Sequence, residues 1–170
     1  MTEADKGVSL RWLWIAVAVI VADQITKATV ESRFELYEVL EVWPVFDLTR
    51  LHNTGAAFSL LADASGWQRW FFIGLGSVVS VGIVFWLRTL PARTPAWLPL
   101  GLVLVMGGAL GNVIDRVRFG YVIDFLHFHW KGAYFPAFNV ADTAITIGAG
   151  LLILDALLEG RRGKRTEGEA

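Results

Sequence analysis

The chain contains no cysteine in its 170 residues. It can therefore form no disulfide, build no thiolate metal site, use no cysteine nucleophile and carry no lipid on a cysteine. Charge is also scarce: 18% of the residues are charged, whereas about a quarter is usual in soluble domains. The formal net charge of −1 gives no reason to expect a nucleic-acid partner, so we expect none.

Apolar residues take the place of the missing charge. They make up 55% of the chain, and its mean hydropathy is +0.51. A water-soluble fold of this length could not bury so much apolar surface, and a disordered chain would not carry it. The composition therefore predicts a polytopic membrane protein, with one domain over residues 1–170.

Four apolar runs are long enough for membrane helices, each of which needs about 20 residues. We expect the spans at about 10–30, 70–88, 96–117 and 138–158. The first run could instead be a cleaved signal peptide, because a short apolar stretch there follows basic residues. Basic residues lie before the first run, between the second and third, and after the fourth. The positive-inside rule then puts both termini in the cytoplasm.

The segments left outside the spans, 31–69 and 118–137, are expected on the extracytoplasmic side. Residues 35–51 are rich in β-forming side chains, and residues 125–130 form another strand-like run. These patterns predict a small sheet at the outer face of the membrane.

Several ionisable or amide side chains lie within the runs, where such groups are costly and are candidates for function. Asp23 and Lys27 are one helical turn apart, so they could form a simple intrahelical ion pair or hold a site. Asn112 and Arg116 have the same spacing, and could bind a peptide backbone or tether the outer loops. Asp115 is expected to pair with a basic neighbour.

Two further carboxylates are expected near the outer interface, Asp124 in the segment 118–137 and Asp142 at the outer end of the fourth run. Asp124 has apolar neighbours on both sides, which favour its neutral form. Asp142 follows Asn139 by three residues, a spacing that predicts a capping box with Asn139 as N-cap. A helix N-terminus favours a negative charge on Asp142. If the two carboxylates meet, they could share a proton and act as acid and base, as in aspartic peptidases.

Other functions fit the sequence less well than a carboxylate pair. His127 and His129 would face the same way on a strand and could bind a metal ion with an aspartate, although interfacial side chains of this kind are more usual. A small transporter or channel component would need polar residues through the whole membrane depth, whereas here they gather towards the outer side. A non-enzymatic assembly factor would leave the two aspartates unexplained.

Four motifs resemble those of the lipoprotein signal peptidase family, also called signal peptidase II. They are Ala22-Asp-Gln-Ile-Thr-Lys27, Asn53-Thr-Gly-Ala-Ala-Phe-Ser59, Gly107 to Arg116 with Val122-Ile-Asp-Phe125, and Phe138-Asn-Val-Ala-Asp142. The resemblance implies a mainly α membrane protein with four transmembrane helices and a small extracytoplasmic β-sheet, the cradle. It also implies a short interfacial helix, expected at about Phe58 to Gly66.

The resemblance further implies an aspartic endopeptidase of the bacterial cytoplasmic (inner) membrane. It would remove the signal peptide from prolipoproteins at the outer face, cutting before the diacylglyceryl-modified cysteine. By the motif match, Asp124 and Asp142 are the catalytic pair. The implied substrate-binding or supporting residues are Asp23, Lys27, Asn53, Gly108, Asn112, Arg116, Asn139 and Ala141. No metal ion or other cofactor is implied. The expected partners are the lipid-modified substrate and membrane lipid, and we expect a monomer.

Overall fold

The computed structural model describes residues 10–55 and 66–167. A 3₁₀ turn, η2 (Leu10–Trp12), leads into α1 (Leu13–Arg33), and the other helices are α2 (Trp67–Thr89), α3 (Trp97–Arg118) and α4 (Val140–Glu167). Among the described residues, four helices are long and apolar enough to cross a membrane. This confirms the predicted mainly α membrane fold. The helix of the fourth run continues beyond residue 158, the predicted end of that span.

The helix α3 lies at the centre of the bundle. It contributes twelve buried residues, whereas α1 and α2 contribute four each. Glycine allows this close packing, because a Cβ at Gly107 would lie 3.0 Å from the backbone of Ala16 in α1. Gly107 and Gly111, four residues apart on α3, thus allow α1 to pack closely against α3.

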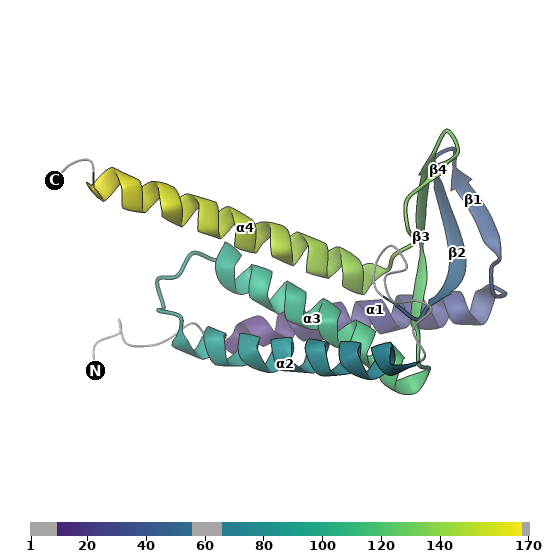
Figure 1. The fold of residues 1–170 in the computed structure, drawn as a ribbon, viewed down its shortest axis with the longest axis horizontal. Coiled ribbons are helices and arrows are strands. Elements are labelled where there is room, and N and C mark those ends of the chain that lie inside the picture. The colour runs from purple at the N-terminus through teal and green to yellow at the C-terminus, as the bar shows by residue number, and fades with distance from the viewer. Residues whose placement is uncertain (1–9, 56–65, 168–170) are drawn as a thin grey trace.

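The strands β1 (Val39–Trp43), β2 (Phe46–Asn53), β3 (Val122–Trp130) and β4 (Ala133–Tyr134) form an antiparallel sheet in the order β1-β2-β3-β4. The sheet stands at one end of the helices, and the start of α1 and the end of α4 lie at the other end (Figure 1). The predicted small sheet is thus confirmed. The predicted interfacial helix lies outside the described residues, except for Gly66, which precedes α2.

A register shift in β2 decides which of its side chains share a face with Asp124. Leu48 pairs with Leu126, but Leu51 pairs with Asp124, so β2 has one extra residue between the two pairs. Directly paired residues point to the same face, and residues two apart on a strand share it. Asn53 therefore lies on the face of Asp124. Without the extra residue, His52 would take that place.

Two apolar clusters hold the fold together. At the end of the bundle away from the sheet, the buried cluster consists of Ala16, Ile83, Leu87, Leu90, Leu98, Leu102, Val103 and Met106. The second cluster fastens the sheet to α1, because Ile123 and Phe125 of β3 pack against Val30. β3 thus has a buried face towards α1, and Asp124 points from its other face.

Candidate active site

Asp124 is held by two side-chain amides. Its Oδ2 accepts a hydrogen bond of 2.9 Å from Asn53 Nδ2, and its Oδ1 accepts one of 2.7 Å from Asn139 Nδ2. The aspartate is 2% exposed and Asn139 is fully buried. The extra residue in β2 makes the first bond possible, and the segment between β4 and α4 supplies the second.

Asp142 lies in the first turn of α4 and forms the predicted capping box with Asn139. The Asn139 Oδ1 accepts the backbone N–H of Asp142 at 2.9 Å, and the Asp142 Oδ2 accepts the backbone N–H of Asn139 at 3.2 Å. The other carboxylate oxygen of Asp142 accepts a bond of 2.7 Å from Asn112 Nδ2. Asn139 therefore contacts both aspartates and joins them through one side chain.

The surroundings of Asp124 change its acidity. Burial, and next the charge of Asp142, raise the pKa of Asp124 from its ordinary 3.8 to about 7. The hydrogen bonds from Asn53 and Asn139 and the charge of Lys27 act in the opposite direction. Below pH 7 the Asp124 carboxyl is thus mainly protonated, as its apolar neighbours in the sequence suggested.

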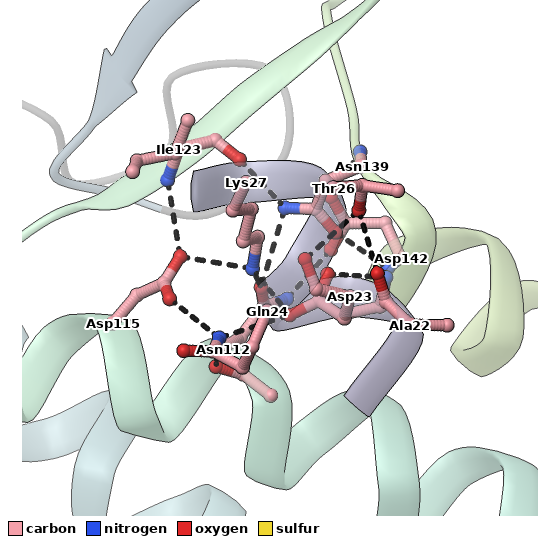
Figure 2. A network of polar contacts seen from close by, with 12 residues as sticks. Ala22, Asp23, Gln24, Thr26, Lys27, Asn112, Asp115, Ile123, Asn139 and Asp142 are labelled. Carbon is pink, nitrogen blue, oxygen red and sulfur yellow. Dashed lines mark hydrogen bonds and ion pairs between the residues drawn. The ribbon is translucent and has the colours of Figure 1, made fainter. Parts of the chain in front are cut away.

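Lys27 lies in a buried polar cluster with Asp23, Asp115 and Asn112 (Figure 2). Its Nζ lies 2.9 Å from Asp23 Oδ2 and 2.9 Å from Asp115 Oδ2, and it donates a bond of 3.0 Å to Asn112 Oδ1. The intrahelical pair of Asp23 and Lys27 is therefore real, but it is also part of contacts between helices. The expected basic partner of Asp115 is Lys27.

Arg116 holds the backbone just after β2, which fits the tethering role considered for it. Its Nη2 donates a bond of 2.8 Å to the carbonyl oxygen of Gly55, and its guanidinium lies 4.8 Å from the ring centre of Phe72. It thus links α3 both to the residues that follow β2 and to α2. Its helical neighbour Asn112 instead bonds to the side chains of Lys27 and Asp142.

Gly108 and Ala141 determine how closely α3 approaches the start of α4. A Cβ at Gly108 would collide with the carbonyl oxygen of Ala141 and lie 2.7 Å from Ile145 Cγ1. The backbone N–H of Ala141 donates to Asp23 Oδ1 at 3.0 Å. The structure therefore brings all ten predicted site residues to one region, with Gly108 acting through backbone packing.

A cavity of about 680 Å³ adjoins the two carboxylates. Asp124, Asp142, Asn112 and Arg116 are among its lining residues at the polar end. Its walls between the helices are mainly apolar and include Leu75 and Val79 of α2, Val105, Ala109 and Val113 of α3, and Ile145 and Ile147 of α4. The cavity thus combines two buried carboxylates with an apolar cleft between helices.

The two histidines considered as metal ligands have other contacts. His127 and His129 both lie against the ring of Tyr134, with centroids 5.4 and 5.6 Å away, so they do face the same way. His129 Nε2 lies 3.2 Å from Asp47 Oδ2. Within residues 10–55 and 66–159, no three potential ligands from histidine, aspartate and glutamate are grouped as a metal site requires.

The sequence interpretation missed two members of the site. Gln24 Nε2 donates to Asp115 Oδ1 at 2.8 Å and to the Gly111 carbonyl oxygen at 3.3 Å. The backbone N–H of Ile123 donates to Asp115 Oδ2 at 3.2 Å. Gln24 could have been found as an amide in an apolar run. The hydrogen bond from Ile123 could not have been predicted from residue types, because its donor is a backbone N–H.

The chain is similar to known proteins over almost its full length. The family model for signal peptidase (SPase) II matches residues 15–158. The lipoprotein signal peptidase of Shewanella pealeana is 51% identical over 164 residues, which cover 96% of this chain and 95% of that protein. The lipoprotein signal peptidase of Pseudomonas aeruginosa is 47% identical over 170 residues, which cover 99% of this chain and 100% of that protein.

Solved structures also share the fold. A bacterial membrane enzyme solved by the in meso method at 2.3 Å resolution matches with a TM-score of 0.81 at 32% identity, covering 96% of both chains. A second, solved at 1.9 Å resolution, matches with a TM-score of 0.78 at 30% identity, covering 89% of this chain and 96% of that one. Because sequence and fold agree over nearly the whole length, this multi-pass membrane protein belongs to the signal peptidase II family of peptidases.

Proposed function

We propose that the chain is an aspartic endopeptidase that removes the signal peptide from prolipoproteins, cutting before the diacylglyceryl-modified cysteine. Asp124 and Asp142 are its catalytic pair. One observation carries the proposal: two carboxylates from different elements both accept hydrogen bonds from Asn139 at the cavity, Asp124 from its side-chain amide and Asp142 from its backbone N–H. The substrate class comes from the relatives, which are lipoprotein signal peptidases.

The two aspartates have different tasks near neutral pH. Both oxygens of Asp142 accept hydrogen bonds, which suits an ionised carboxylate acting as the base. Asp124, with a pKa of about 7, holds the proton and acts as the acid. This division gives the pair the mixed protonation that aspartic-peptidase chemistry needs.

The reaction follows from this protonation. Water attacks the scissile carbonyl carbon and gives a proton to Asp142, while Asp124 gives its proton to the carbonyl oxygen. When the carbon–nitrogen bond breaks, Asp142 passes its proton to the leaving amine, and the oxygen returns a proton to Asp124. Both carboxyl groups then have their original protonation, so no other proton donor is needed.

The cavity suits a substrate that is apolar and membrane-embedded. Its apolar walls lie between helices that are long enough to cross a membrane, and its polar end contains the carboxylates. An apolar substrate segment between the helices would bring a polar peptide bond to Asp124 and Asp142. Binding energy from the apolar segment would then align the reacting bond.

The neighbouring residues support the pair in distinct ways. Asn53, Asn112 and Asn139 donate hydrogen bonds to the carboxylates. Asp23 accepts the N–H of Ala141 and so holds the start of α4. Arg116 fixes the backbone at Gly55, beside the cavity. Gly108 allows α4 to approach α3.

We propose that the site lies at the outer face of the bacterial cytoplasmic membrane. Residues 31–69 and 118–137 of the single domain would then be extracytoplasmic, with both termini in the cytoplasm and membrane lipid around a monomer. Arg88 in the last turn of α2 and Arg93 in the loop before α3 support this orientation, because basic residues at span ends remain inside.

Single cysteines test the orientation, because the chain has none of its own. Ser32→Cys is expected to react with an impermeant thiol reagent on intact cells, and Glu159→Cys is expected to react only after lysis. Both side chains are exposed in the bundle. Labelling at residue 159 without labelling at residue 32 would overturn the orientation and the outer position of the site.

The purified protein in detergent, with a lipid-modified precursor peptide, tests the catalytic pair. Asp124→Asn and Asp142→Asn are each expected to lower the cleavage rate by about 10²–10⁴-fold, because an amide can neither take nor share the proton. The double variant is expected to be little worse than either single one, since the pair acts as a unit. Substantial cleavage by either folded single variant would contradict the proposal.

A further inference from the structure

Lys27 of α1 contacts three side chains on α1 and α3 from a buried position. The side chain is 2% exposed, and its two carboxylate partners, Asp23 and Asp115, are 0% and 1% exposed. An ammonium group has three N–H donors, and Lys27 has three partners: these carboxylates and Asn112 Oδ1 (Figure 2). Its hydrogen-bonding capacity is therefore fully used inside the protein.

Each carboxylate partner of Lys27 also holds the backbone next to one catalytic aspartate. Asp23 Oδ1 accepts the N–H of Ala141, the residue directly before Asp142, at 3.0 Å. Asp115 Oδ2 accepts the N–H of Ile123, the residue directly before Asp124, at 3.2 Å. Through these two carboxylates, the Lys27 ammonium is thus linked to the two elements that carry the catalytic pair.

The third partner of Lys27 is the side-chain amide of Asn112. Lys27 can only donate, so its contact turns the oxygen of the Asn112 amide towards the ammonium. The nitrogen of the same amide then points to Asp142 and donates a bond of 2.7 Å. With the amide reversed, an oxygen would face the carboxylate and repel it. Lys27, together with a longer bond of 3.3 Å from Asn139 Nδ2 to the same oxygen, therefore sets which way Asn112 faces.

We infer that Lys27 is a positioning residue that sets the separation and orientation of Asp124 and Asp142 through Asp23, Asp115 and Asn112. The inference rests on the proposed function, because it concerns the geometry of that catalytic pair. The two aspartates come from β3 and α4, so their separation depends on contacts between elements. Catalytic groups need this kind of support from residues behind them.

The charge balance explains why a lysine is needed at this place. Asp23 and Asp115 are both buried and close to one ammonium, and two buried carboxylates without a cation between them would repel each other. Gln24 Nε2 bridges the same pair, with bonds of 3.2 Å to Asp23 and 2.8 Å to Asp115. An amide supplies hydrogen bonds there but no charge, so Gln24 cannot replace Lys27.

The most informative variant is Asp115→Asn. It keeps the shape of the side chain and leaves the pair of Asp23 and Lys27 intact, but it removes the anion shared by Lys27 and Ile123. We expect kcat per folded enzyme to fall by about 100-fold, the effect of a small misplacement of catalytic groups. KM for the lipid-modified peptide should stay within about twofold, because substrate contacts in the cavity are unchanged.

Asp155→Asn is the matched control. Asp155 is also a buried helical carboxylate, but it lies far from the pair along α4, where it accepts a bond of 2.7 Å from Trp97 Nε1. An asparagine oxygen can accept the same bond, and we expect kcat to stay within about twofold of the parent. An equal loss of kcat in Asp155→Asn and Asp115→Asn would mean that any buried charge matters, and would overturn the inference.

Lys27→Met and the double variant Lys27→Met/Asp115→Asn test whether the two residues act as a unit. The double variant is expected to have a kcat no lower than Lys27→Met alone, because both changes break the same connection. If the losses of kcat in the two single variants add up in the double variant, the two residues do not act as a unit. Thermal unfolding in detergent measures the folded fraction, and if Lys27→Met does not fold, the comparison of Asp115→Asn with Asp155→Asn decides the matter.

The outcomes separate the two proposals. Substantial activity in folded Asp124→Asn or Asp142→Asn would overturn the catalytic pair itself. Inactivity of those two variants together with parental kcat in folded Asp115→Asn would overturn only the positioning by Lys27. A lower folded fraction with unchanged kcat in Asp115→Asn would show a purely structural cluster and would also overturn the inference.

Discussion

The two ends of the helical bundle bury different kinds of side chain. Beside the sheet, α1 and α3 bury charged residues, among them Asp23, Lys27 and Asp115. At the far end the same helices bury an apolar cluster that includes Leu102 and Val103. Figure 1 shows that these ends lie at opposite extremes of α3, so one helix takes part in both.

This difference assigns stability to the apolar end of the bundle and chemistry to the charged end. Apolar burial stabilises a fold without any exact geometry of charges, whereas buried charges are tolerated only when each is paired and hydrogen-bonded. Asp155, at the far end, is a buried carboxylate that accepts a hydrogen bond from the indole of Trp97. Beside the sheet, the paired charges are organised around Asp124 and Asp142. We therefore expect changes at the sheet end to affect rate, and changes at the far end to affect stability.

The largest effect in this comparison is expected from Gly108→Ala. The added Cβ would collide with the Ala141 carbonyl oxygen and push the start of α4, which carries Asp142, away from α3. A displacement of this kind is expected to lower kcat by about 100-fold. Cleavage assays in detergent measure the change. Gly82→Ala is the matched control in α2, where a Cβ would meet nothing within 4 Å; an equal loss there would refute the explanation by packing.

An effect on stability is expected from Leu102→Ala. Leu102 is 1% exposed in the apolar cluster of the far end, and its truncation should lower the free energy of unfolding by about 2–5 kcal/mol. The kcat per folded enzyme should stay at the parental value, because the proposed catalytic pair lies at the other end. Unfolding curves and initial rates on the same sample measure both quantities.

The control for Leu102→Ala is Leu157→Ala, since Leu157 is 63% exposed in the bundle. It should leave both the free energy of unfolding and kcat close to the parental values. A kcat in Leu102→Ala as low as that of Gly108→Ala would show that the two ends are not separate.

A smaller effect, on pH dependence, is expected from Asn53→Ala. The hydrogen bond from Asn53 stabilises the Asp124 anion and so lowers the pKa of that carboxyl. Without this bond the pKa of Asp124 rises above about 7, and the acid keeps its proton to higher pH. The alkaline limb of the pH–rate profile should therefore move to higher pH. A limb that stays in place or moves to lower pH would contradict Asp124 as the acid.

His52→Ala is the control for this profile, because His52 lies next to Asn53 but on the other face of β2. Its ring stacks on Tyr121 with centroids 3.8 Å apart. Burial, and next the charge of Arg50, lower the pKa of His52, so it is already neutral where the alkaline limb occurs. The limb should not move in this variant.

Much of the site was predictable because its signals are local. Asn139 and Asp142 are three residues apart, so the capping box follows from helix geometry. Asp23 and Lys27 are one turn apart, and their ion pair follows in the same way. The four apolar runs predicted the four long helices for the same reason, since helix length and apolar content are properties of continuous segments.

What the sequence by itself determined is the set of long apolar helices, the capped start of α4 and the presence of carboxylates at one end of the bundle. Only the tertiary structure decided that Asn53 shares a face with Asp124, because one extra residue in β2 reverses the sides on which its residues point. It also decided that Lys27 meets Asp115 and that Asp124 has a pKa of about 7. The physical reason is distance along the chain: Asn53 and Asp124 are 71 residues apart. Register, burial and charge pairing at such separations depend on how whole elements pack.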